Sequence, residues 1–111
     1  MEQMNANEFV ACWKNERDRF LATYLNEAQE TTVSTKIARL NLAADQLPIM
    51  RDVVDGILTD AFYTLLLGLD GAASIGGVQQ AYQIRDEGSN LISDPGELEA
   101  EAWEQFYGDA A

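Results

Sequence analysis

The sequence predicts a mostly helical, compact single domain (residues 1–111) of about four helices, with a small β-hairpin before the last helix. Apolar residues recur every three to four positions over most of the first 67 residues, the period of an amphipathic helix. A glycine-rich break at 68–77 is followed by strict alternation, the period of a strand. The length suits one domain of about 100–150 residues, and a 47% hydrophobic composition is sufficient for a buried core.

The first predicted helix spans about Asn7 to Asn26. Asn5 or Asn7 is expected to cap it, because a short polar side chain can accept the free amides of the first turn. Its apolar face consists of Phe9, Val10, Trp13, Phe20, Leu21, Tyr24 and Leu25.

A second helix is predicted from about Thr32 to Ala43, with Thr31 or Thr32 as its cap. The third is predicted from Pro48 to about Leu67, because proline is favoured in the first helical turn. It is apolar on nearly all sides towards its end, so we expect it to be the central helix. On its polar side, Arg51 and Asp55 are spaced to form an i, i+4 ion pair.

The hairpin is predicted from residues 78–85, where apolar and polar side chains alternate. Residues 86–90 have the composition of a turn, and residues 91–92 begin a short return strand.

The last helix is predicted to begin at Asp94 and to reach about Tyr107. Asp94 is the expected N-cap, with Pro95 at the first position and Glu97 closing a capping box. The side chains expected to point inward are Leu98, Ala102, Trp103 and Phe106.

Charge is distributed very unevenly along the chain. Residues 1–50 carry 7 acids and 5 bases, whereas residues 51–111 carry 12 acids and 2 bases, which is net −10 of the total −12. Unpaired like charge destabilises a compact state, so a binding surface for a cationic partner would explain the excess. A pI near 4.1 argues against direct binding to nucleic acid or an anionic membrane.

The acidic last helix is the candidate partner-binding site. Glu97, Glu101 and Glu104 are spaced to share one face, and Trp103 and Tyr107 are candidate aromatic anchors. The alternative is a solvated acidic face, with Trp103 in the core. The full candidate set is Glu87, Glu97, Glu99, Glu101, Trp103, Glu104 and Tyr107.

Other residue types favour a non-enzymatic protein without metal or cofactor. The chain has no histidine, the commonest general base, and its single cysteine, Cys12, therefore has no histidine to activate it. Asp52, Asp55 and Asp60 are interpreted as a solvated helix face in preference to a metal site. No signal segment is visible at the N-terminus, and the longest apolar stretch, 61–69, is shorter than the roughly 20 residues of a membrane span. We therefore expect a cytoplasmic protein.

Two blocks within residues 62–106, FYTLLLGLDGAASIGGVQQAYQIRDEGSN and GELEAEAWEQF, resemble small uncharacterised bacterial proteins of the immunity type. The resemblance implies a cytoplasmic bacterial protein that neutralises a toxin domain by binding it. It transfers no catalytic or binding residue.

These observations predict an acidic, non-enzymatic inhibitor that occludes a basic partner surface, for example that of a nuclease toxin. One alternative is a structural or regulatory interaction module, for instance a homodimer formed through an exposed part of the third helix. A second alternative is an enzyme that uses Asp and Glu with Mg²⁺.

Overall fold

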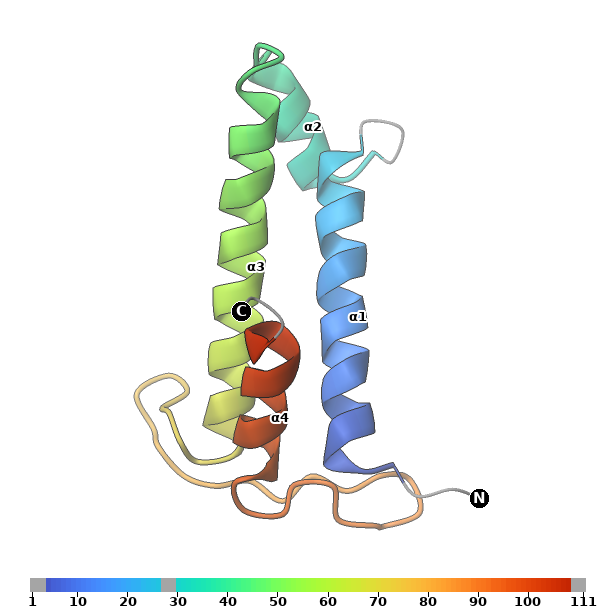
Figure 1. Ribbon diagram of the computed structural model, residues 1–111, viewed down its shortest axis with the longest axis vertical. Helices are drawn as coiled ribbons and strands as arrows, with labels where there is room; N and C mark the ends of the chain where they lie inside the picture. Colours follow the sequence, from blue (N-terminus) through green and yellow to red (C-terminus); the bar gives the residue numbers. More distant parts are fainter. Residues whose placement is uncertain (1–3, 27–29, 109–111) are drawn as a thin grey trace.

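The computed structural model describes residues 4–26 and 30–108, and within these ranges it contains four helices (Figure 1). They are α1 (Ala6–Leu25), α2 (Thr32–Arg39), α3 (Leu47–Leu69) and α4 (Glu97–Phe106). α1 and α3 run alongside each other over the length of the molecule, and α2 joins them at one end. α4 packs against both long helices at the other end. The mostly helical class and the four helices are therefore confirmed.

The start of α1 is fixed by a reciprocal capping box. The Asn5 side chain accepts the amide of Glu8 at 2.8 Å, and the Glu8 carboxylate accepts the amide of Asn5 at 3.2 Å. These two bonds satisfy amides that have no partner within the helix. Asn5, one of the two residues predicted to cap this helix, is therefore the cap.

The core lies where α1, α3 and α4 meet. Val10, Leu66 and Leu98 are fully buried there, one from each helix. Phe62 of α3 extends this contact along α1, with its ring 5.7 Å from both Trp13 and Phe20 in edge-to-face geometry. Such ring pairs add to the free energy of area burial.

The ends of α2 and α3 differ from the prediction by a few residues. α2 ends at Arg39 instead of Ala43, because Asn41 takes a left-handed backbone (φ 50°) that a helix cannot continue through. α3 continues to Leu69, so Gly68 lies inside the helix and not in the glycine-rich break. Gly68 is buried, and an added Cβ would overlap the side chain of Ile75.

The predicted hairpin is wrong. Residues 4–26 and 30–108 contain no strand, only two isolated bridges, Ile75 with Val78 and Arg85 with Leu91. The Ile84 amide donates to Ser93 Oγ at 2.8 Å, and Ser93 Oγ donates to the Tyr82 carbonyl at 3.0 Å. The Ile92 amide donates to the Ile84 carbonyl at 2.7 Å and the Asp86 amide to the Asn90 carbonyl at 3.0 Å, which makes the single Arg85–Leu91 bridge. Because Ser93 takes the Ile84 amide and the Tyr82 carbonyl, this pairing does not continue into a strand ladder.

The turn at 86–90 is confirmed. One oxygen of the Asp86 carboxylate accepts the amides of Gly88 and Asn90, both at 2.9 Å. This is the local pattern for which Asp is favoured in turns.

The molecule is elongated, with principal dimensions of 48 × 31 × 30 Å. Its radius of gyration is 16.5 Å, against about 13 Å for a compact domain of this length. The extension arises because α4 covers only one half of the α1–α3 pair. No helix in the described residues combines the length and apolarity that crossing a bilayer requires.

Candidate protein-binding site

The start of α4 is held by a carboxylate from α3. Asp70, which ends α3, accepts the amide of Gly96 at 3.1 Å and the amide of Glu99 at 2.9 Å, one on each carboxylate oxygen. A negative charge at this position also interacts favourably with the helix dipole. The predicted cap at Asp94 is wrong, because Gly96 has a left-handed backbone (φ 85°) and becomes the N-cap residue itself. Helix α4 therefore begins at Glu97 and is oriented by its contact with α3.

The glutamates of α4 do not form one surface. Glu101 turns towards α1, where its carboxylate accepts the Asn7 side-chain amide at 2.8 Å. Gln105 donates to the Asn7 carbonyl at 3.0 Å and to the Glu101 carboxylate at 3.3 Å. Glu101 is therefore engaged in holding α4 to α1, although the sequence grouped it with the outward carboxylates.

Trp103 lies on the surface, with 56% of its area exposed. The expectation that it points inward is wrong, because the buried side of α4 is formed by Leu98 and Ala102. The Trp103 ring stacks on Tyr107, with centroids 5.4 Å apart and an interplanar angle of 29°. Tyr63 of α3 meets Tyr107 edge to face at 4.9 Å and Trp103 at 6.4 Å. The three rings form one cluster across α3 and α4.

Tyr63 is a member of this cluster that sequence reasoning did not single out. Tyr63 and Trp103 are forty positions apart in the sequence, and no residue spacing within α3 or α4 indicates their contact. Burial, and then the negative charge of Glu99, raise the pKa of the Tyr63 hydroxyl above its ordinary value. Glu99 and Trp103 are four residues apart on α4, so the Glu99 carboxylate lies on the same side of the helix as the ring cluster.

Two further carboxylates, Glu97 and Glu104, are exposed on the same helix. In the described residues, ion pairs are formed only within α1 and between α1 and α3, so no lysine or arginine pairs with an α4 carboxylate. Glu97 lies with Glu101 beside Asn5 and Asn7 at the start of α1, away from the rings. We define the acidic aromatic patch as Tyr63, Glu99, Trp103, Glu104 and Tyr107.

Glu87 is placed elsewhere. It is exposed in the turn at 86–90, which lies beneath the start of α1 and away from the ring cluster (Figure 1). The adjacent Asp86 has its pKa lowered, chiefly by the hydrogen bond from the Asn90 amide and further by the amides of Met4 and Gly88. The structure therefore does not bring Glu87 together with the patch.

Of the three carboxylates predicted to form a solvated face of α3, Asp52 and Asp60 are exposed, but Asp55 has a different partner from the predicted one. Asp55 pairs with Arg17 of α1 and not with Arg51. Arg17 also donates to Thr59 Oγ1 at 2.9 Å, so one guanidinium group joins the two long helices at mid-length. Among the described residues, no group of three or more His, Cys, Asp or Glu side chains is arranged to hold a metal ion.

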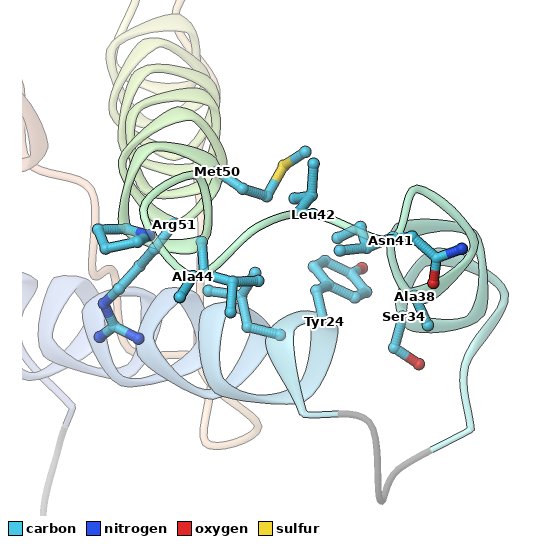
Figure 2. A pocket seen from close by; sticks show the side chains of 12 residues that line it. Tyr24, Ser34, Ala38, Asn41, Leu42, Ala44, Met50 and Arg51 are labelled. Atoms are coloured by element: carbon cyan, nitrogen blue, oxygen red, sulfur yellow. The ribbon is translucent and has the colours of Figure 1, made fainter.

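A cavity of about 540 Å³ opens at the α2 end of the molecule, between α1, α2 and the start of α3 (Figure 2). Tyr24 forms part of its wall, and Leu42 and Met50 lie on one side of it. Arg51 is an exposed charged side chain in its lining.

Comparisons with protein-family models, with curated proteins and with solved structures give no match for this chain. The immunity-type resemblance therefore stays a prediction.

Proposed function

We propose that this protein binds a basic protein partner through the acidic aromatic patch and inhibits that partner by covering its cationic surface. The observation that carries the proposal is the position of Trp103, which is exposed and already stacked on Tyr107 beside unpaired carboxylates. A tryptophan of this kind is favourable at an interface, because Trp and Tyr are enriched among the residues that dominate binding free energy.

The chemistry of the patch suits an arginine or a lysine of the partner. Carboxylates pair with a guanidinium group, and the face of an indole attracts a cation within about 6 Å of the ring centre. Tyr63 packs edge to face against the rings of both Trp103 and Tyr107 and so helps to hold them in place. This support limits the conformational entropy that Trp103 would lose on binding.

A nucleic-acid-binding domain presents the kind of basic surface that this patch would fit. Its arginines and lysines are placed to neutralise phosphates, and carboxylates of an inhibitor can occupy the same positions. A nuclease toxin is therefore a suitable partner class. In this mechanism the inhibitor blocks access to the substrate site and performs no reaction.

Titration with an arginine-rich peptide tests the proposal. Glu99→Gln/Glu104→Gln removes two patch charges, and Asp52→Asn/Asp60→Asn removes two charges from α3 as a matched control. We expect calorimetry to show weaker binding for the patch variant alone, and a loss of affinity for the wild type at high salt. Equal weakening by both variants would mean that the peptide is attracted to the net charge of the protein, and would contradict binding at a specific patch.

A further inference from the structure

The middle of this strongly acidic chain is electrically neutral. Residues 31–59 contain three acids and three bases, although the whole chain carries −12. The same segment holds six of the ten large hydrophobic side chains that are exposed in the described residues. They are Val33, Leu40, Leu47, Ile49, Val53 and Ile57.

Three of these side chains form a ridge on α3. Ile49, Val53 and Ile57 are spaced four residues apart, so they lie on one side of the helix along about 12 Å. They are 63%, 51% and 62% exposed, whereas the following residue, Leu58, is buried. We call Ile49, Val53 and Ile57 the α3 ridge.

The accessible surface area of this chain is larger than that of a typical folded monomer of the same mass. Its accessible area is 7384 Å², against about 6,100 Å² for a folded monomer of 12.3 kDa. The excess of about 1,300 Å² exceeds the roughly 800 Å² that each partner buries in a standard-sized complex. The α3 ridge lies in the half of the α1–α3 pair that α4 leaves uncovered.

We infer that the α3 ridge is a homodimer interface, in which a second copy of this chain packs the same ridge around a two-fold axis. Two copies that each carry −12 repel one another over most of their surfaces. They can approach closely where the facing segments carry no net charge, and residues 31–59 meet that condition. In a two-fold pairing each surface contacts its own copy, so an unpartnered apolar ridge is satisfied on both chains at once.

The geometry is compatible with helix packing. Residues four apart form the ridges that interdigitate in the commonest class of helix crossing, at about −50°. Leu42 and Met50, beside the cavity of Figure 2, extend the apolar surface from the first half of α3 towards α2. α4 packs at the opposite end of α3, so the acidic aromatic patch remains free for another partner.

Sedimentation velocity from the low micromolar range upward tests this interface. We expect a concentration-dependent dimer for the wild type, and a dimer Kd at least about tenfold higher for Val53→Gln/Ile57→Gln. Glutamine is a better helix former than valine or isoleucine, so the variant keeps its fold. The matched control, Val78→Gln/Leu91→Gln, replaces two exposed apolar side chains outside α3 and the neutral segment, and should dimerise like the wild type.

A wild type that stays monomeric at every concentration would overturn the inference, whatever else occupies the ridge. So would a ridge variant that dimerises like the wild type, or a control that loses the dimer equally. The response to salt distinguishes this proposal from the function proposed above. Added salt should leave the dimer unchanged or strengthen it, because it screens the repulsion between the acidic parts of the two copies outside residues 31–59. The same salt should weaken binding to the arginine-rich peptide.

Discussion

Replacing Asp70 tests whether a carboxylate of α3 fixes the start of α4. In Asp70→Ala the amides of Gly96 and Glu99 lose their acceptor, and the favourable charge at the helix N-terminus disappears. Loss of an N-capping side chain costs about 0.5–2 kcal/mol, and an exposed charge near a helix end contributes about 0.3–1 kcal/mol. We expect a loss of about 1–2 kcal/mol in the free energy of unfolding.

Thermal unfolding followed by circular dichroism measures this loss. An unfolding entropy of about 2.1 cal/mol/K per residue gives a fall in Tm of about 4–9 °C for a chain of this length. Asp70→Asn keeps one acceptor oxygen and should show an intermediate fall. Asp52→Ala is the control, because Asp52 is exposed on α3 and alanine is the better helix former. If Asp70→Ala were as stable as Asp52→Ala, the proposed cap would be refuted.

Four further predictions concern packing and titration. Gly56→Ala should raise the free energy of unfolding by about 0.5–1 kcal/mol, since nothing lies within 4 Å of the added Cβ. Gly68→Ala should lower it by about 1 kcal/mol in urea unfolding, since its Cβ would overlap Ile75. In ¹³C NMR, the pKa of Tyr63 should be above 10.0, and Glu99→Gln should lower it; an unchanged value would remove Glu99 from the patch. The lowered pKa of Asp86 means that its contribution to stability is present above its ordinary value of 3.8 and is lost as pH falls through the lowered pKa. Asp86→Asn should therefore flatten the acid branch of the stability curve, and an unaltered branch would contradict this.

The helices could be predicted because their signals are local. The 3.6-residue period of α1 and α3 reports the side that faces the core, and the capping boxes of Asn5 and Thr31 involve residues three positions apart. The shorter α2 was not predictable from period alone, because the left-handed backbone at Asn41 ends the helix before the apolar pattern ends.

The start of α4 could not be predicted because its cap is distant in sequence. Asp94, Pro95 and Glu97 satisfy every local rule for a helix start, yet the acceptor is Asp70, at the end of another helix. Only the packing of α4 on α3 brings that carboxylate to the free amides.

The hairpin prediction was wrong for a related reason. Alternation indicates an extended backbone, but it does not show which groups satisfy the backbone amides. Here the Ile84 amide donates to the Ser93 side chain, and the Tyr82 amide donates to the Leu69 carbonyl. The extended segments therefore meet only in isolated bridges within the described residues.

The candidate site was predicted in part. Its carboxylates and both α4 aromatics could be chosen from residue type and spacing. The separation of Glu97 and Glu101 from the ring cluster depends on the start of α1, and the ring contacts of Trp103 depend on Tyr63 of α3. Both are tertiary contacts that the period of α4 does not encode.

The two tryptophans offer the most direct test of the proposed binding surface. Trp103 belongs to the acidic aromatic patch, whereas Trp13 packs between α1 and α3 and serves as an internal control. In ¹H–¹⁵N NMR spectra recorded during titration with the arginine-rich peptide, we predict that the Trp103 indole signal moves in a saturable manner and the Trp13 signal does not. A stationary Trp103 signal, while carboxylate-bearing residues elsewhere shift, would contradict the assignment of this patch as the partner-binding site.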